Sequence, residues 1–324
     1  MTLFDDFVPE GSPRRGDLHT ARGLIRLLRL PGIGPKRALK LADLMLNWES
    51  LASSSSAELA EITKTDGESL LSAIRQSYSE DYDVKDCSVV CCFDEGWPRW
   101  LNDLPDPPVL VYFRGTLPPG ESLAVVGTRN PTDFGRSVVE TVTEECARRG
   151  FGVVSGLALG IDAAAHRAAL RYGTRTWAIL GSGVDVPSPK ENIELAEEIL
   201  ESGGGLLSEQ PPGTIPSPRT LVARNRLQSA AASAVVAAQC GIPSGTLHTV
   251  RFALQQGRKV VVPRPRSPWD LERESAGNMA LTDPHGCSPE TIGATGALAR
   301  RLRNRKPLAD LVLQHSADVA RIWE

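Results

Sequence analysis

The 324-residue sequence lacks several features that would assign it to a class at once. No apolar run approaches the roughly 18–20 residues that a membrane span requires, so we expect no transmembrane helix. The first residues, Met1–Phe7, are acidic and precede no apolar signal core, which favours a cytoplasmic protein over a secreted one. None of the six cysteines stands in C-x-x-C spacing, which favours free, buried thiols over a disulfide framework.

Standard nucleotide-binding motifs are also missing. The sequence contains neither G-x-G-x-x-G nor G-x-x-x-x-G-K-[ST], the glycine patterns that hold the phosphates of dinucleotides and of ATP. The net charge of −3 gives no sign of a nucleic-acid-binding protein. Basic residues are nevertheless concentrated in the stretches 219–226, 258–266 and 300–306, so a local basic surface is compatible with this charge.

The pattern of apolar residues divides the chain into four segments. Residues 1–17 show no periodicity and are expected to form a flexible lead. From 18 to 82, apolar residues recur at helical spacing, which predicts a small all-α domain. The segment 83–290 is predicted to be an α/β domain with a mostly parallel sheet, because strand and helix patterns alternate along it. Residues 291–324 are predicted to be a short basic helical segment without a clear winged helix.

The alternation gives a specific set of elements. Strands are predicted at 123–126, 152–154, 176–180, 205–207, 234–238 and 259–262. Helices are predicted at 136–149, 162–172, 193–202, 221–230 and 245–256. Because parallel strands place their carboxyl ends at one edge of the sheet, we expect the loops that follow them to converge there.

Small and basic residues follow the first two of these strands. They are Gly127, Thr128 and Arg129, and then Ser155, Gly156 and Gly160. Glycine lets a ligand approach the backbone, and the N-terminus of the following helix presents free N–H groups to an anion. An arginine adds a forked donor that suits phosphate. The two loops therefore predict a phosphate-binding site.

Three further segments carry residues of the same kinds. They are Gly181 with Gly183, then Arg224, Asn225 and Arg226, and finally Ser244, Gly245 and Thr246 at a helix start. Each alone is also compatible with a purely structural turn or ion pair. Their expected convergence at one sheet edge is the stronger argument for a binding site.

Evidence for catalysis is weak. Asp162 and His166 lie four residues apart on one helix face, which also fits a capping aspartate and a structural histidine. Related nucleotide hydrolases have the signature P-G-G-x-G-T-x-x-E, in which the last position is a catalytic glutamate; here Thr249 stands in its place. We therefore expect no enzyme activity, no cofactor and no metal ion.

A second candidate site lies in the helical domain. Gly32 and Gly34 form a tight turn between two predicted helices, and Lys36 and Arg37 follow it. This pattern looks like a helix-hairpin-helix, whose backbone N–H groups can hold a DNA phosphate. A hairpin that serves packing alone fits the same residues.

Taken in order, these segments resemble the DprA/Smf family of DNA-processing proteins. The resemblance rests on the segments 93–98, 106–115, 126–129, 155–162, 180–183, 207–209, 211–213, 223–226 and 244–246. It implies an extended Rossmann-like domain that binds single-stranded DNA, with Arg129, Arg224 and Arg226 on the DNA backbone. The family pattern has an arginine where this chain has Leu159, which removes one positive charge from the expected pocket.

The resemblance also implies partners. Members of the family typically form homodimers and help to load the recombinase RecA onto single-stranded DNA. Alternatives that the sequence leaves open are a DprA-like regulator or antitoxin-like component of a phage-defence system, with its own partner protein, and a nucleotide-sensing Rossmann protein.

Overall fold

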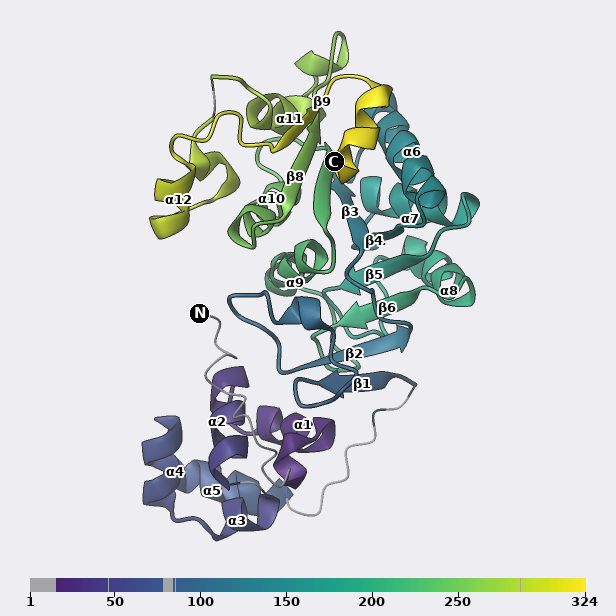
Figure 1. Cartoon of the computed structure of the whole chain (residues 1–324). Helices are drawn as coiled ribbons and strands as arrows, with labels where there is room; N and C mark the ends of the chain where they lie inside the picture. The colour runs from purple at the N-terminus through teal and green to yellow at the C-terminus, as the bar shows by residue number, and fades with distance from the viewer. Residues whose placement is uncertain (1–15, 46, 78–83, 85, 286) are drawn as a thin grey trace. The chain divides into compact units, whose positions relative to one another are not determined.

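The computed structural model describes residues 16–45, 47–77, 84, 86–285 and 287–324 (Figure 1). Its contacts divide the chain into two compact units. The first contains the described residues up to Trp97 together with Pro105–Tyr112, and the second contains Pro98–Leu104 and Phe113–Glu324. Of the predicted lead, 1–17, only the last two residues are described. The start of the predicted α/β domain, up to Trp97, groups with the helical unit instead.

The first unit is a cluster of short helices. They are α1 (Ala21–Arg29), α2 (Pro35–Met45), α3 (Trp48–Ser53), α4 (Ser56–Thr63) and α5 (Gly67–Gln76), preceded by the 3₁₀ turn η1 (Asp17–His19) and followed by strand β1 (Ser88–Cys91). Polar caps start several of these helices; Thr20 accepts from the backbone N of Gly23 at 3.1 Å, at the start of α1. Fully buried leucines such as Leu24, Leu41 and Leu59 form the core of this unit.

The second unit is built on a parallel sheet. Its strands are β3 (Ser122–Gly127), β4 (Gly152–Ser155), β5 (Thr176–Leu180), β6 (Gly205–Ser208), β7 (Ala234–Gln239), β8 (Lys259–Pro263) and β9 (Leu311–Leu313). They lie in the order β6-β5-β4-β3-β7-β8-β9, and each of these neighbouring pairs is parallel. Strand β2 (Leu110–Gly115) is shared between the two units.

Helices cover both faces of this sheet (Figure 1). They are α6 (Asp133–Arg148), α7 (Ile161–Arg171), α8 (Ile193–Glu201), α9 (Pro218–Ala230), α10 (Gly245–Gln255), α11 (Ala276–Leu281) and α12 (Gly296–Leu302). Alternate residues of β3 enter two different cores: Leu123 and Val125 pack with α6 and α7, whereas Ala124 and Val126 pack with α10. Short 3₁₀ turns lie in the connections, at η3 (Arg99–Leu101), η4 (Lys190–Asn192), η5 (Trp269–Leu271), η6 (Arg273–Ser275) and η7 (Pro289–Ile292). The α/β class with a parallel sheet is confirmed.

The segment after residue 290 differs from its prediction. It contains helix α12 with the basic residues Arg300 and Arg301, as expected, but it also contains strand β9, which pairs with β8, and the 3₁₀ helix η8 (Ser316–Trp323). The apolar residues Val319 and Ile322 pack into the core that lies between the sheet and helices α6 and α7. The segment is therefore an integral part of the second unit. None of the described helices combines the length and apolar character that crossing a membrane requires.

Candidate functional site

The loops that follow β3 and β4 meet at the carboxyl edge of the sheet. The backbone N of Ile161, at the start of α7, donates to Thr128 O at 3.0 Å. A Cβ atom on Gly160 would lie 2.4 Å from the same oxygen, and one on Gly127 would lie 2.4 Å from Ile161. Both glycines are therefore required by close packing between the loops. The predicted convergence of these two loops is confirmed.

A groove of about 710 Å³ opens beside these loops, between α6 and α7. Its cationic lining consists of Arg129, Arg136, Arg167 and Arg171, and its acidic lining of Glu140 and Glu191. Only Arg129 of this set was singled out from the sequence. Arg167 and Arg171 lie one turn apart on α7, so a search for basic helix faces would have identified them.

The arginines of the groove differ in their partners. Arg171 forms an ion pair with Glu140, and Arg136 lies 3.6 Å from Asp133. Arg129 and Arg167 are exposed and form no ion pair with any residue that the structure describes. These two guanidinium groups are available to an external anion.

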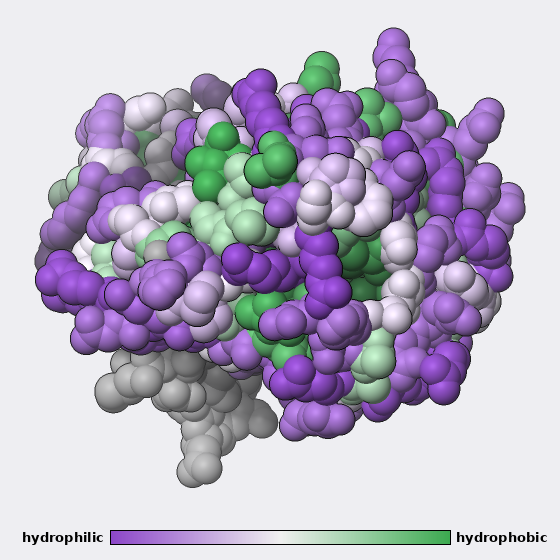
Figure 2. Space-filling model, turned by 90° about the horizontal axis from the view of Figure 1, so that it is seen from above, coloured by the Kyte–Doolittle hydropathy of each residue, from purple (hydrophilic) through white to green (hydrophobic). Residues whose placement is uncertain are grey.

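Leu159 stands on the rim of this groove, with 41% of its surface exposed. Together with Pro131, Ala163 and Ala164, it gives the groove an apolar part beside the arginines. In the coloured part of the face shown in Figure 2, hydrophobic residues form small patches among hydrophilic ones.

Arg224 is largely buried. Its side chain is 9% exposed, and Nη1 donates to Ile179 O, in β5, at 2.7 Å. A Cβ atom on Gly156 would lie 1.6 Å from Nη1. The guanidinium group therefore fills the space directly below the β4–α7 loop.

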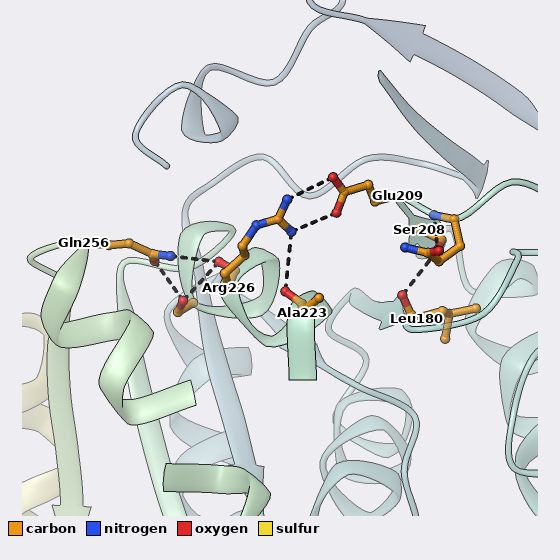
Figure 3. Close-up of polar contacts among 8 residues, drawn as sticks. Leu180, Ser208, Glu209, Ala223, Arg226 and Gln256 are labelled. Atoms are coloured by element: carbon orange, nitrogen blue, oxygen red, sulfur yellow. Dashed lines mark hydrogen bonds and ion pairs between the residues drawn. The ribbon is translucent and has the colours of Figure 1, made fainter. Parts of the chain in front are cut away.

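Arg226 is also held inside the protein. Its Nη1 and Nη2 donate to the two carboxylate oxygens of Glu209 at 2.8 and 2.9 Å (Figure 3). Nη1 also contacts Ala223 O, and the backbone oxygen of Arg226 accepts from Gln256. The structure therefore places Arg224 and Arg226, both predicted to contact a DNA strand, at buried positions where each is bound to partners in the same chain.

The remaining predicted residues join the loops to one another. Asn225 Nδ2 donates to Gly245 O at 3.3 Å, across to the start of α10. With its amide oriented to satisfy both ends, Gln228 donates to Asn225 Oδ1 and accepts from Gly156 N, each at 3.0 Å. Helix α9 therefore holds the loops after β4 and β7 through one hydrogen-bonded network. Gln228 belongs to this network but was not among the residues predicted from the sequence.

Hydroxyl and glycine residues of the site have structural contacts as well. Ser155 Oγ donates to Val125 O at 2.7 Å, and Ser244 caps α10 by accepting from Thr246 N at 3.2 Å. A Cβ on Gly181 would lie 3.0 Å from Leu221, and one on Gly183 would lie 2.4 Å from Asp185. Each glycine allows a close approach within the protein.

Asp162 and His166 are buried near Arg224. Burial raises the pKa of Asp162 above its ordinary value, and the nearby Arg224 charge opposes this shift. Burial lowers the pKa of His166 to about 3, and the Arg224 charge adds to this effect. Neither group faces the groove, which argues for structural roles.

In the helical unit, the hairpin is formed as predicted. Gly32 has φ 72°, and Arg37 Nη1 donates to Gly32 O at 2.6 Å across the turn. A second hairpin joins α4 and α5, where Lys64 takes φ 54°.

A family model described as "DNA recombination-mediator protein A" matches residues 88–286. The DNA processing protein DprA of Bacillus subtilis is 39% identical over 167 residues, which are 51% of this chain and 56% of that protein. DprA of Streptococcus pneumoniae is 37% identical over 169 residues, 52% of this chain and 59% of that protein. The chain thus matches about half the length of these curated relatives.

Two solved structures are similar to this one. The X-ray structure of DNA processing protein A from Streptococcus pneumoniae has a TM-score of 0.69 at 26% identity, covering 93% of this chain and 96% of that one. A structure of the Helicobacter pylori protein, described for its single-stranded DNA binding mode, has a TM-score of 0.53 at 29% identity, covering 60% of this chain and 86% of that one. With the match over 88–286, these similarities show that the chain belongs to the DNA recombination-mediator protein A family, also called DprA/Smf.

Proposed function

We propose that this protein binds single-stranded DNA at the carboxyl edge of its sheet, with the DNA backbone in the groove between α6 and α7. The observation that carries this proposal is the pair of exposed arginines, Arg129 and Arg167, which line one groove and have no ion-pair partner among the described residues. A guanidinium group binds phosphate through two parallel hydrogen bonds. Two such groups in one groove fit successive phosphates of a strand.

The apolar part of the groove favours a single strand over a duplex. In a duplex the faces of the bases are stacked on one another, whereas a single strand can place a base against Leu159, Ala163 and Pro131. Contacts of this kind tolerate any sequence. We therefore propose that binding is salt-dependent and largely independent of base order.

Arg224 and Arg226 have a different role in this proposal. Through Ile179, Gly156 and Glu209 they fix the loops that surround the groove. The loops therefore lose little conformational entropy when DNA binds. The residues at Gly181, Gly183, Asn225 and Ser244–Thr246 support the same framework. We propose that only the exposed members of the set contact phosphate.

The helical hairpin remains a second predicted DNA contact. Lys36 is exposed beside the Gly32–Gly34 turn, although Arg37 is engaged with Gly32 O. We propose that this hairpin contributes weak backbone contacts. A Lys36→Ala variant should then lower the affinity for DNA slightly and evenly for all sequences.

The DNA-binding proposal is tested by fluorescence anisotropy with single-stranded oligonucleotides over a range of salt concentrations. Changing both Arg129 and Arg167 to alanine should reduce the slope of log K against log salt by about 0.7 for each phosphate that the variant no longer neutralises. Arg175→Ala is the matched control, because Arg175 is exposed but precedes β5 at the opposite edge. Absence of salt-sensitive binding by the wild type, or an equal reduction in the control, would contradict the proposal.

We further propose that the protein is not an enzyme, works in the cytoplasm as a homodimer, and passes the strand to the recombinase RecA. The family description as a recombination mediator supports this partner. The experiment is strand exchange by RecA on DNA covered with single-strand-binding protein, with and without this protein. A defence-system partner would instead be indicated by binding to single-stranded DNA without any effect on RecA.

A further inference from the structure

The loop between β3 and α6 carries Arg129, and both of its ends are bound to Gln239. The backbone N of Thr128 donates to the backbone O of Gln239 at 2.7 Å, and the backbone N of Thr132 donates to its side-chain Oε1 at 2.9 Å. Gln239 is the last residue of β7 and is fully buried. It is not among the residues that line the groove, so an effect on a ligand there must act through another residue.

An irregularity in the strand pairing directs the Gln239 side chain toward α6. The register of the β3–β7 pair shifts between Val126 and Gly127, which places Gln239 opposite Gly127. In a regular strand, successive side chains point to opposite faces of the sheet. Here Ala238 belongs to the core beside α6, and Gln239 also reaches α6, because a Cβ on Gly135 would lie 2.4 Å from its Oε1. A bulge can re-aim a side chain in this way.

The side-chain amide of Gln239 has a hydrogen-bond partner for each of its groups. Oε1 accepts from Thr132 N, and Nε2 donates to Thr132 Oγ1 at 2.9 Å and to Ser275 Oγ at 3.0 Å. Turning the amide over would place its NH₂ group against the Thr132 N–H, donor against donor, so only one orientation fits. The amide therefore fixes Thr132, which directly precedes α6, relative to β7 and the turn η6.

Arg129 lies within the span of chain that Gln239 holds. On its other side the loop packs on the start of α7, where a Cβ on Gly160 would lie 2.5 Å from the backbone C and O of Arg129. Asn130 N donates to Thr128 Oγ1 at 3.2 Å, which tightens the turn. The guanidinium group of Arg129 has no ion pair among the described residues, so its position at the groove depends on the loop backbone.

We propose that Gln239 is a positioning residue for DNA binding. It holds the loop 128–132 in one conformation, which keeps the guanidinium group of Arg129 at the groove before a ligand arrives. The inference rests on the proposed function, in which Arg129 binds a DNA phosphate. A loop that is already ordered loses less conformational entropy when the ligand binds, so the affinity is higher. Gln239 thus acts on the affinity without contacting DNA.

The test combines Gln239→Met with Arg129→Ala. Methionine keeps the length of the side chain and removes the amide. In fluorescence anisotropy with a single-stranded oligonucleotide at low salt, Gln239→Met should bind about three- to ten-fold more weakly than the wild type. In the Arg129→Ala background the same change should alter the affinity by less than about two-fold, because the side chain that the loop positions is absent. No loss in the wild-type background, or an equal loss in both backgrounds, would overturn the inference.

Hydrogen exchange tests the same inference without DNA. The backbone amide of Thr132, which donates to Gln239 Oε1, should exchange about five- to ten-fold faster in Gln239→Met. The amides of β5 report global stability and should change less. Equal exchange of Thr132 in the variant and the wild type would overturn the inference. If the wild type does not bind single-stranded DNA, the proposed function falls, and this measurement alone decides whether Gln239 holds the loop.

Two further variants make the result specific. Thr282→Val is the matched control, because Thr282 is also buried and donates to Asn278 O at 2.7 Å, within α11 and away from the groove lining. It should lower the stability and leave the affinity for DNA unchanged. If Gln239→Met does not fold, Gly135→Ala takes its place, because its methyl group would displace the amide while alanine favours the helix. It should show the same loss that depends on Arg129, and a wild-type affinity would contradict the inference.

Discussion

The guanidinium group of Arg224 and the backbone of Gly156 occupy adjoining space that leaves no room for a side chain between them. An added Cβ would lie 1.6 Å from Nη1 and 2.3 Å from Cζ of Arg224. Arg224 cannot withdraw, because Nη1 is bound to Ile179 O in the neighbouring strand. Gly156 is therefore required by an internal contact, whatever ligand the loop approaches.

This contact predicts the effect of Gly156→Ala. The methyl group must displace a buried, hydrogen-bonded guanidinium group, so we expect the free energy of unfolding to fall by more than about 3 kcal/mol. Urea unfolding followed by circular dichroism measures it. Gly34→Ala is a suitable control, since a Cβ at Gly34 meets nothing within 4 Å and should cost less than about 1 kcal/mol. Similar decreases in the two variants would argue against the packing role.

The buried histidine predicts a dependence of stability on pH. His166 Nδ1 lies 2.7 Å from Thr176 Oγ1, whose own proton goes to Val153 O, so Nδ1 carries the hydrogen and Nε2 has no partner among the described residues. Its pKa is about 3 in the folded protein against 6.5 in the unfolded chain. Between these values the unfolded chain binds the extra proton, so stability rises with pH and is lost on acidification below 6.5.

The size of this effect follows from the same pKa difference. From pH 6.5 to 5, His166 should account for a decrease in stability of about 2 kcal/mol. Chemical unfolding at several pH values should show a flatter profile for His166→Asn, which keeps a donor for Thr176 but does not titrate. Parallel profiles for variant and wild type would contradict this prediction.

The hydrogen bonds of Asn278 predict a second strongly destabilising substitution. Its Nδ2 donates to Ala237 O and Pro263 O at 3.0 and 3.1 Å, and Oδ1 accepts from Cys240 N at 2.7 Å. Asn278→Asp has the same shape but places a carboxylate oxygen against buried carbonyl oxygens. We expect the free energy of unfolding to fall by about 3 kcal/mol or more in unfolding experiments. The exposed Asn304→Asp provides the control and should be almost neutral.

Removing a negative charge from the acidic lining of the groove should increase the affinity for single-stranded DNA. Glu140 pairs with Arg171 and opposes a negatively charged ligand. Glu140→Gln should therefore increase the affinity for single-stranded DNA about two- to five-fold at low salt. Glu144→Gln, one turn further along α6 and outside the groove, should leave the affinity unchanged. A decrease for Glu140→Gln would show that Arg171 needs this partner to contact DNA.

Replacing Leu159 with arginine should change the salt dependence of DNA binding. An arginine at this exposed rim position would add a phosphate contact, so Leu159→Arg should steepen the slope of log K against log salt by about 0.7. Leu271→Arg is the control, since Leu271, in the 3₁₀ turn η5, is 87% exposed and does not line the groove. An unchanged slope for Leu159→Arg would place the strand away from this rim.

The sheet was predictable because its strands are short apolar runs between glycine and polar turns. The run at 176–180 was predicted with the bounds that the structure has, and the strands at 123–126 and 152–154 are one or two residues longer in the structure. The last strand, Leu311–Leu313, was missed because three residues are too few to show a period. It is defined by its pairing with β8 rather than by its own pattern.

The arginines of the site show where sequence reasoning stops. Arg129, Arg224 and Arg226 look alike in a sequence, yet only Arg129 is exposed. What separates them is the partner that the fold brings in, such as Glu209 beside Arg226. Such partners are distant in the sequence, so their charge compensation becomes visible only in three dimensions.

The central strand pair has a consequence for the order of folding. β3 pairs with β7, and beside this pair the backbone N and the hydroxyl of Ser233 both donate to Ser122 O, across 111 residues of chain. Closing so long a loop costs entropy before any contact repays it, so this pairing should come late. During synthesis, one edge of β3 would stay unpaired until β7 has left the ribosome. The growing chain would then need protection from aggregation, and the groove beside the β3 and β4 loops would be completed in one of the last folding steps.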